Sequence, residues 1–383
     1  MKILYIGSSA DFHIDLWVKY FTTNHSVFLF SDKEDYLEDQ PFDKVTIFHN
    51  QGILGGLLNF FKSKSHLLFQ LNKLLSVIIF SKKIEKIIDK HNIDIVHAHN
   101  VYQGFLTSFV KTRVPIIFTP MGSDIIISAQ KNSLYRFMAN QAFKRADVVT
   151  GDSLLIQKKG FNVGAKKESN YIIQNGVDSS IFYPQANNLR ARYAVEKDET
   201  LIFSPRGFAE IYNIETILKS CALLIEKGFK LRLMLCYPFK DKTHATIKEK
   251  SKDLMIDDKI IWLGSLSYEE MPDYYNLSDI VISVPDSDSS PKSVYEAMFC
   301  GKAIIVTDLA WSYEFLGQEE CFLRVKPKNE IDLSEAIIKL IEKPEYSSHL
   351  SANALKYAKK HYDYQNNMQE MESIMEGLLL RDK

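Results

Sequence analysis

Short runs of β-branched and other apolar residues alternate along the chain with longer segments in which apolar residues recur at helical spacing. This alternation is typical of a parallel β-sheet covered by helices. In the first half of the chain, the predicted strands are KILYIG (2–7), SVFLFS (26–31), KVTIFHN (44–50), DIVHAHN (94–100), PIIFTP (115–120) and DVVTGDS (147–153). Segments 81–92 and 134–146 are predicted helices between them. One doubly wound α/β domain accounts for all of these elements.

The rhythm breaks at residues 171–199, which contain an Asn-Gly turn, a proline and a polar stretch, so we predict a linker there. The alternation then restarts with the predicted strands TLIFSPRG (200–207), LRLMLCYP (231–238), KIIWLGSL (259–266), DIVISVPD (279–286), AIIVTD (303–308) and CFLRVKP (321–327). We therefore predict two α/β domains, at residues 1–182 and 199–361. A terminal amphipathic helix at 362–383 is expected to pack back onto the first.

Composition narrows the choice of function. The 383 residues are 46% apolar and 25% charged with a formal net charge of −1, so bulk attraction to nucleic acid is not expected. The four cysteines have no metal-ligand spacing and are expected to be buried thiols, as in a reducing cytosol. No stretch is long and apolar enough for a signal peptide or a membrane span. The expected location is cytoplasmic.

An acidic, serine-rich turn at 286–293 stands between the predicted strand 279–286 and a predicted helix that begins near Ser293. Ligands in open α/β sheets bind at the carboxyl ends of the strands, and a helix N-terminus attracts phosphate. Ser289, Ser290 and Ser293 offer hydroxyls to such a phosphate. Asp288, and Glu296 eight positions later, offer acceptors for sugar hydroxyls. A nucleoside diphosphate carrying a sugar fits this arrangement; simple capping of the helix is the alternative.

In segment 288–308, Asp288 and Ser289 are followed by SPKSVYEAMFCGKAIIVTD. This segment resembles the acidic-x7-Glu signature of glycosyltransferase family 4, whose members are retaining enzymes of GT-B fold. The signature usually starts with Glu, where this chain has Asp288. Further segments resemble the family in the same order along the chain, namely DIVHAHN (94–100), TPMGSDI (119–125), YIIQNGVDSSIFYP (171–184) and SPRGFAEIYNIETILKS (204–220). This collinearity is more specific than any single motif.

The resemblance implies a GT-B fold, in which two doubly wound Rossmann-like domains face a central cleft. It implies a nucleotide-diphosphate sugar of UDP or GDP type as donor, bound by the C-terminal domain, and a glycan or polyprenyl-diphosphate-linked acceptor bound by the N-terminal domain. Asp288 would bind the transferred sugar, Glu296 the ribose, and Arg206 the diphosphate. The further donor-binding positions are Gly7, Ser8, Tyr212, Ser289, Ser290, Pro291, Lys292, Ser293 and Val294.

No cofactor and no metal ion are expected for this chemistry. Residues 286–288 read DSD, the letters of a DxD metal motif, but Asp288 is already assigned to the sugar. Retention without a protein nucleophile is attributed in this family to front-face attack assisted by the leaving phosphate. The chain would then act by positioning and charge stabilisation.

Two positions depart from the family pattern. Met121 stands where the family usually has a sugar-contacting His, and the Lys expected after Arg206 is missing, with Tyr212 and Asn213 in its neighbourhood. Either the donor sugar lacks the matching hydroxyl or another residue replaces the His. Lys292 is the candidate to supply the missing cation.

The acceptor candidates lie in the first domain and are His13, His99, Met121, Gly122 and Asp124. His97 and His99 alternate on one strand and therefore point to the same side, with His99 nearer the strand end. Packing is the alternative role for His99, a helix surface position is the alternative for His13, and capping of the segment after it is the alternative for Asp124.

Residues 55–86 mix lysines with leucines and aromatic residues, a composition that suits contact with an anionic membrane surface. An ordinary helix pair packed against the sheet is the alternative. By family analogy, the expected role is bacterial surface polysaccharide assembly such as lipopolysaccharide or capsule, at the inner face of the cell membrane. A non-catalytic sugar-nucleotide-binding relative and a nucleotide-sugar epimerase are the rival functions.

Overall fold

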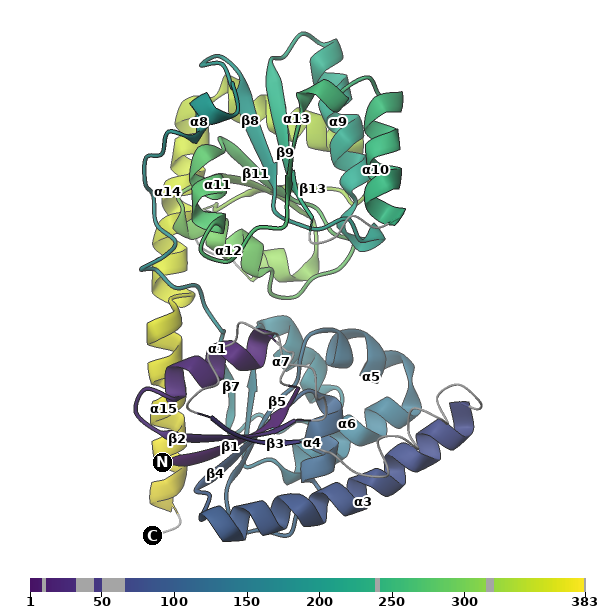
Figure 1. Cartoon of the computed structure of the whole chain (residues 1–383), viewed down its shortest axis with the longest axis vertical. Coiled ribbons are helices and arrows are strands. Elements are labelled where there is room, and N and C mark those ends of the chain that lie inside the picture. The colour runs from purple at the N-terminus through teal and green to yellow at the C-terminus, as the bar shows by residue number, and fades with distance from the viewer. Residues whose placement is uncertain (9–11, 32–44, 50–65, 238–241, 315–319, 382–383) are drawn as a thin grey trace. The chain divides into compact units, whose positions relative to one another are not determined.

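The computed structural model describes residues 1–8, 12–31, 45–49, 66–237, 242–314 and 320–381, and it divides into two compact units. Unit 1 comprises Met1–Asn175 and Asn367–Lys383, and unit 2 comprises Gly176–Asn366. Each unit is an α/β structure built on its own parallel sheet (Figure 1). The predicted pair of doubly wound domains is thus confirmed.

Within the described residues, the sheet of unit 1 has seven parallel strands in the order β3-β2-β1-β4-β5-β6-β7. The strands are β1 (Lys2–Gly7), β2 (Ser26–Ser31), β3 (Val45–His49), β4 (Ile95–His99), β5 (Ile116–Thr119), β6 (Val148–Gly151) and β7 (Asn170–Ile172). The helices are α1 (Phe12–Phe21), α3 (His66–His91), α4 (Val101–Thr107), α5 (Ala129–Lys131), α6 (Ser133–Arg145), α7 (Leu154–Phe161) and the π-helical turn η2 (Asp124–Ser128).

Within the described residues, the sheet of unit 2 has six parallel strands in the order β10-β9-β8-β11-β12-β13. These are β8 (Thr200–Ser204), β9 (Leu231–Cys236), β10 (Ile260–Gly264), β11 (Ile280–Ser283), β12 (Ala303–Thr307) and β13 (Leu323–Val325). The helices are α8 (Leu189–Arg192), α9 (Ile214–Glu226), α10 (Lys242–Asp253), α11 (Met271–Leu277), α12 (Lys292–Phe299), α13 (Glu330–Glu342) and α14 (Pro344–His361). Short 3-10 turns are η3 (Glu210–Tyr212), η4 (Asp257–Lys259) and η5 (Ala310–Tyr313).

The strands form because their apolar runs are buried on both faces, as parallel sheets require. All five residues of β4 and all five of β12 are buried. In unit 2, the core on one face of the sheet includes residues of α11, α12 and α14, and the core on the other includes residues of α9, α10 and α13 (Figure 1). Both sheets reverse their strand order beside their first strand, at β1/β4 and β8/β11. This reversal is where open α/β sheets bind ligands.

The linker prediction is correct only in part. Its first residues form β7, which pairs with β6 as the edge strand of unit 1, and its later residues form α8. The segment from Gly176 to Phe182 lies in unit 2, where Phe182 is fully buried in the core. Gly176 has φ 71°, and a Cβ there would lie 2.6 Å from the backbone of Tyr364, so the Asn-Gly turn needs its glycine.

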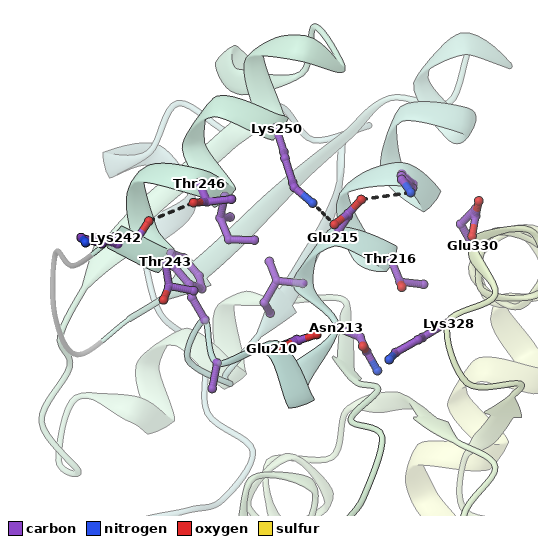
Figure 2. Close-up of a pocket in the computed structure, with 15 residues that line it drawn as sticks. Glu210, Asn213, Glu215, Thr216, Lys242, Thr243, Thr246, Lys250, Lys328 and Glu330 are labelled. Carbon is purple, nitrogen blue, oxygen red and sulfur yellow. Dashed lines mark hydrogen bonds and ion pairs between the residues drawn. The ribbon is translucent and has the colours of Figure 1, made fainter.

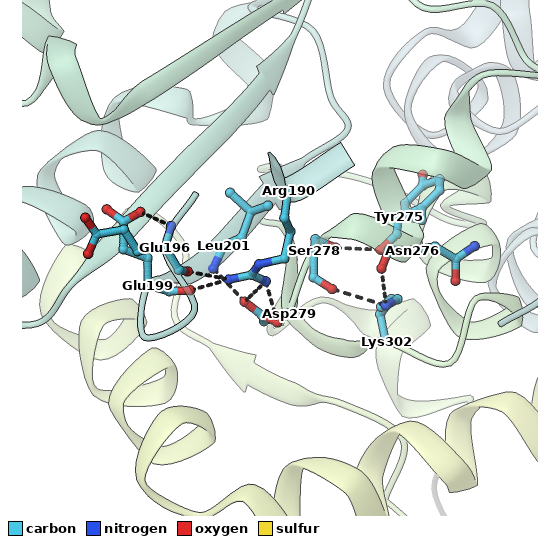
Figure 3. A network of polar contacts seen from close by, with 9 residues as sticks. All are labelled: Arg190, Glu196, Glu199, Leu201, Tyr275, Asn276, Ser278, Asp279 and Lys302. Atoms are coloured by element: carbon cyan, nitrogen blue, oxygen red, sulfur yellow. Dashed lines mark hydrogen bonds and ion pairs between the residues drawn. The ribbon is translucent and has the colours of Figure 1, made fainter. Parts of the chain in front are cut away.

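A polar network ties α8 to the amino ends of the unit 2 strands (Figure 3). Arg190 donates to both carboxylate oxygens of Asp279, at 3.2 and 3.1 Å, and to the carbonyl oxygen of Glu199. The same carboxylate accepts the backbone N–H of Leu201 at 2.7 Å. Lys302 donates to the carbonyl oxygens of Asn276 and Ser278. The network therefore joins the starts of β8 and β11 at the edge opposite the strand ends.

The last helix, α15 (Tyr364–Arg381), packs in unit 1 over most of its length, from Asn367 onward. Glu372 accepts hydrogen bonds from Tyr20 Oη at 3.0 Å and from His25 Nε2 at 2.6 Å. Burial and this carboxylate together raise the pKa of Tyr20 to about 12. The C-terminal segment is thus held to the first unit by polar contacts as well as by buried methionines such as Met368 and Met371.

Candidate functional site

The loops that follow β8 and β11 bring together the residues that the sequence singles out in unit 2. Arg206 lies just after β8 and Asp288 lies in the turn after β11, and these strands are hydrogen-bonded neighbours. The Arg206 guanidinium donates to Asp288 Oδ2 at 3.0 Å and to Ser293 Oγ at 3.3 Å. Both charged side chains are mostly buried, with 17% and 15% exposed. A cation and an anion are therefore paired at the carboxyl edge of the sheet.

The turn before α12 is organised by Asp288 itself. Its Oδ1 accepts the backbone N–H of Ser289 at 2.8 Å and that of Ser290 at 3.4 Å. Pro291 is the N-cap of α12 and is buried, so the helix begins at Lys292, one residue earlier than predicted. The first backbone N–H groups of a helix have no carbonyl partner within it. Those of Lys292 and Ser293 stand in this position beside Arg206.

Glu296 lies one turn into α12 and is buried, with 6% of the residue exposed. Tyr275 of α11 donates to its Oε2 at 2.8 Å. Burial raises the pKa of Glu296 to about 7, although Lys292, Tyr275 and Arg206 all favour the ionised form. The carboxylate is thus a buried acceptor whose charge is offset by two nearby cations.

Aromatic rings contact both cations. The Arg206 guanidinium carbon lies 4.4 Å from the ring centroid of Tyr212, and the Lys292 ammonium lies 4.5 Å from that of Tyr268. The electron-rich face of such a ring stabilises a cation placed over it. Sequence patterns identify Tyr212 through its place in the family motif. Tyr268 and Tyr275 carry no motif, and only the fold places them here.

The acceptor candidates of unit 1 have different environments. Asp124 Oδ2 accepts the backbone N–H of Val101 at 2.9 Å and that of Met121 at 3.1 Å, so it holds the loop before η2 against the start of α4. Burial raises the pKa of Asp124 to about 7, with these backbone bonds opposing the rise. Met121 and Gly122 are partly exposed. Asp124 therefore orients the loop that carries Met121, one of the two roles considered from sequence.

His99 is fully buried, with no exposed surface. Its ring centroid lies 4.2 Å from that of His97 and 5.7 Å from that of Trp17 in α1, which covers this side of the strand. The two histidines do share one side of β4, as the alternation predicts. The environment of His99 matches the packing alternative, and we leave it out of the acceptor site proposed below.

Gly7 ends β1, and Ser8 follows it in a partly exposed position. A Cβ on Gly7 would lie 2.0 Å from Ile14 Cδ1, so the glycine allows α1 to approach the strand end. The side chain of His13 is outside the described residues. Within the described residues, no group of three or more His, Cys, Asp or Glu side chains could hold a metal ion.

A cavity of about 610 Å³ lies in unit 2 between the starts of α9, α10 and α13 (Figure 2). Lysines and glutamates line it, and Glu215 there contacts both Lys219 and Lys250. Neither Arg206, Asp288 nor Glu296 is among the described side chains that line it. The cavity is therefore separate from the residue set predicted from sequence, although two of its lining residues, Asn213 and Lys328, both contact Asp286.

The predicted membrane-facing segment is described only in part, because residues 50–65 lie outside the described residues. In the described part of α3, Ile84, Ile87 and Ile88 are buried in the core, whereas Ile78 and Ile79 are 56% and 49% exposed. Lys82 is exposed one turn later. Among the described helices, none combines the length and apolar content needed to span a membrane.

Two protein-family models match the chain. The model described as "Glycosyl transferase 4-like" matches residues 2–153, and the model described as "Glycosyl transferases group 1" matches residues 185–357. Together the two models span most of both units. The order of the two matches is the order of the two α/β domains.

Individual proteins are similar over most of the chain. N,N'-diacetylbacillosaminyl-diphospho-undecaprenol alpha-1,3-N-acetylgalactosaminyltransferase of Campylobacter jejuni is 23% identical over 71% of this chain and 74% of its own. The structure of Anabaena Alr3699/HepE in complex with UDP and glucose superposes with a TM-score of 0.77 at 18% identity, covering 98% of this chain and 100% of that one. Sucrose-phosphate synthase from Thermosynechococcus elongatus gives a TM-score of 0.80 at 16% identity, with full coverage of both chains. The structural likeness establishes the fold.

The buried Glu296 makes a prediction about stability. Its pKa is about 7 in the folded chain and close to 4.5 in the unfolded one, so the folded chain binds this proton more tightly. The stability that protonation contributes is complete below pH 4.5 and is lost as the pH rises through 7. Glu296→Gln should therefore gain stability relative to the wild type between pH 5 and pH 8, by up to about 3 kcal/mol.

Urea unfolding of both proteins at pH 5, 6, 7 and 8 measures this difference. Glu335→Gln, on an exposed position of α13, is the matched control and should follow the wild type. A stability difference between Glu296→Gln and wild type that stays constant with pH would contradict the assigned burial of the charge.

Proposed function

Because the chain belongs to the group 1, family 4-like glycosyltransferases, we propose that it transfers a sugar from a nucleotide-diphosphate donor to a glycan or polyprenyl-diphosphate-linked acceptor, with retention of anomeric configuration. The observation that carries the proposal is the cluster of Arg206, Asp288 and Ser293 at the start of α12, with Glu296 one turn further. Its residues have the chemistry that an activated sugar requires.

Unit 2 would bind the donor. The diphosphate lies at the start of α12, where backbone N–H groups and the helix dipole favour negative charge. A guanidinium has five N–H donors, so Arg206 can bind phosphate oxygens with those that Asp288 and Ser293 do not use. Lys292 adds a second positive charge in place of the family's missing Lys. Glu296 accepts hydroxyl groups of the ribose, and Asp288 accepts a hydroxyl of the transferred sugar.

Catalysis would rest on charge stabilisation and positioning. As the glycosidic bond to phosphate breaks, negative charge grows on the diphosphate, and Arg206, Lys292 and the helix start stabilise it. The leaving phosphate oxygen takes the proton of the acceptor hydroxyl, which attacks the same face of the sugar. The bond to the acceptor forms as that to phosphate breaks, so the configuration is retained.

Unit 1 would bind the acceptor, through the loop of Met121 and Gly122 that Asp124 holds in place. The relative from Campylobacter jejuni is named for a diphospho-undecaprenol substrate, which supports a lipid-linked acceptor. UDP is the preferred nucleotide, because Anabaena Alr3699/HepE was crystallised with UDP. Assembly of a bacterial surface polysaccharide in the cytoplasm, at the inner face of the cell membrane, is the proposed setting.

A panel of UDP- and GDP-sugars tests the function. A donor should raise the melting temperature by mass action, by more as its concentration rises, and should be hydrolysed slowly or transferred when an acceptor is present. Arg206→Ala should lose the shift because it removes the main cation of the diphosphate site. Binding without any turnover would support the non-catalytic alternative. Turnover to an epimerised nucleotide sugar would support the epimerase.

Lys292→Ala should raise the Michaelis constant for the nucleotide sugar by about tenfold, since one charge-assisted contact to phosphate is lost. Lys359→Ala removes an exposed lysine from α14 and is the matched control. Steady-state kinetics at fixed acceptor concentration measures both constants. A Michaelis constant for Lys292→Ala equal to that of the wild type would remove Lys292 from the diphosphate site.

We also propose that the exposed side of α3 contacts an anionic membrane surface, through Ile78, Ile79 and the neighbouring lysines. The wild type should float with vesicles that contain phosphatidylglycerol and remain at the bottom with pure phosphatidylcholine vesicles. The Ile78→Asp, Ile79→Asp double variant should float less, because it removes the apolar insertion. Wild-type protein that stays at the bottom with both vesicles has no such surface.

A further inference from the structure

Two separate loops supply the donor-site residues of unit 2, and their relative position decides whether these residues act together. The loop after β8 carries Arg206 and Tyr212, and the loop after β11 carries Asp288. The Arg206–Asp288 ion pair joins the loops in the absence of donor. A bound diphosphate competes with Asp288 for the same guanidinium. The loops therefore need a connection that the ligand does not disturb.

Asn213 provides such a connection. It follows Tyr212 directly, and its side-chain amide donates to the Val284 carbonyl oxygen at 3.0 Å and to Asp286 Oδ1 at 2.7 Å. These bonds use both hydrogens of the amide. The backbone N–H of Asp286 also donates to the Ile211 carbonyl oxygen at 2.8 Å. Only 7% of Asn213 is exposed, so the contacts are protected from water.

We propose that Asn213 is a positioning residue for the donor site, which fixes the loop of Arg206 against the loop of Asp288 through Val284 and Asp286. The proposal rests on the proposed function, since it assumes that the two loops bind a nucleotide sugar. Asn213 lies outside the ion pair of Arg206 and Asp288. Its amide hydrogens bond to the opposite loop and to no group assigned to the donor.

The position favours asparagine for two reasons. Its φ is 53°, in the left-handed region, which asparagine adopts more readily than most residues. Its amide supplies two donors to acceptors on the opposite loop. Glycine would satisfy the backbone but not the loop, and aspartate would place a second carboxylate against Asp286 with no donor between them.

Other contacts support the same loop more weakly. Lys328 pairs with Asp286 Oδ2 at 2.8 Å, but 58% of the lysine side chain is exposed, so water and salt screen the pair (Figure 2). Although partial burial opposes ionisation, the bonds from Lys328 and Asn213 hold the pKa of Asp286 below its usual value. Thr307 Oγ1 donates to the Pro285 carbonyl oxygen at 2.8 Å. The buried amide of Asn213 is therefore the contact that connects this loop to the loop of Arg206.

The test compares Asn213→Gly, which keeps the backbone conformation and removes the amide, with the wild type. UDP and GDP are titrated in parallel by calorimetry, below the melting temperature of each protein. The dissociation constant for the bound nucleotide should rise about tenfold in Asn213→Gly, with a matching rise in the donor Michaelis constant. Lys328→Met is the matched control and should stay within about twofold of the wild type.

Asp286→Ala keeps Asn213 and removes its acceptor, so it tests the same connection if Asn213→Gly folds poorly. Asp286→Asn retains an acceptor oxygen and should restore most of the affinity that Asp286→Ala loses. The double variant of Asn213→Gly and Asp286→Ala should bind no more weakly than the worse single variant, because both remove one interaction.

A melting temperature that falls in Asn213→Gly while the dissociation constant stays at the wild-type value would show a merely structural role and overturn the proposal. Asp286→Asn behaving like Asp286→Ala would also contradict it. A wild-type chain that binds neither UDP nor GDP gives a different result, since it removes the proposed function and with it the role of Asn213.

Discussion

The parallel pairing of β8 with β11 is the constraint on which the site of unit 2 depends. The strand order reverses at this pair, so the loops that leave the two strands lie side by side at one edge of the sheet. Arg206 and Asp288 are 82 positions apart in sequence and 3.0 Å apart in space for this reason. Every other contact of the site, from Tyr212 to Ser293, follows from which residues occupy these two loops.

The charges at this edge form a balanced set. Two cations, Arg206 and Lys292, lie near two carboxylates, Asp288 and Glu296, and aromatic rings cover part of each cation. The burial of Glu296 keeps its carboxyl close to neutrality at pH 7, so the site has net positive character that favours an anionic ligand. Unit 1 has a different chemistry: Asp124 there bonds to backbone N–H groups and its nearby histidines are packed among aromatic rings.

Most strands could be predicted from sequence because buried parallel strands are continuous apolar runs with clear boundaries. The sequence does not reveal β7, because three residues with a polar start give no such run. The predicted strand 279–286 ends at Ser283 instead, since Pro285 has no N–H to donate and Asp286 bonds to a different segment. Asp288 and Glu296 could be identified through their spacing and their likeness to a family motif. Tyr275, Tyr268 and the connection made by Asn213 could not, because only the folded topology decides which side chains from distant segments meet. His99 has the right periodicity, but α1 covers that side of the strand.

The most direct test of the central claim is a crystal structure of the chain grown with a hydrolysis-resistant UDP-sugar. The account predicts that the diphosphate lies within hydrogen-bond distance of Arg206 and of the backbone N–H of Ser293, with the ribose against Glu296. A nucleotide bound instead in the cavity between α9 and α10, or an empty turn before α12 at saturating ligand, would contradict it.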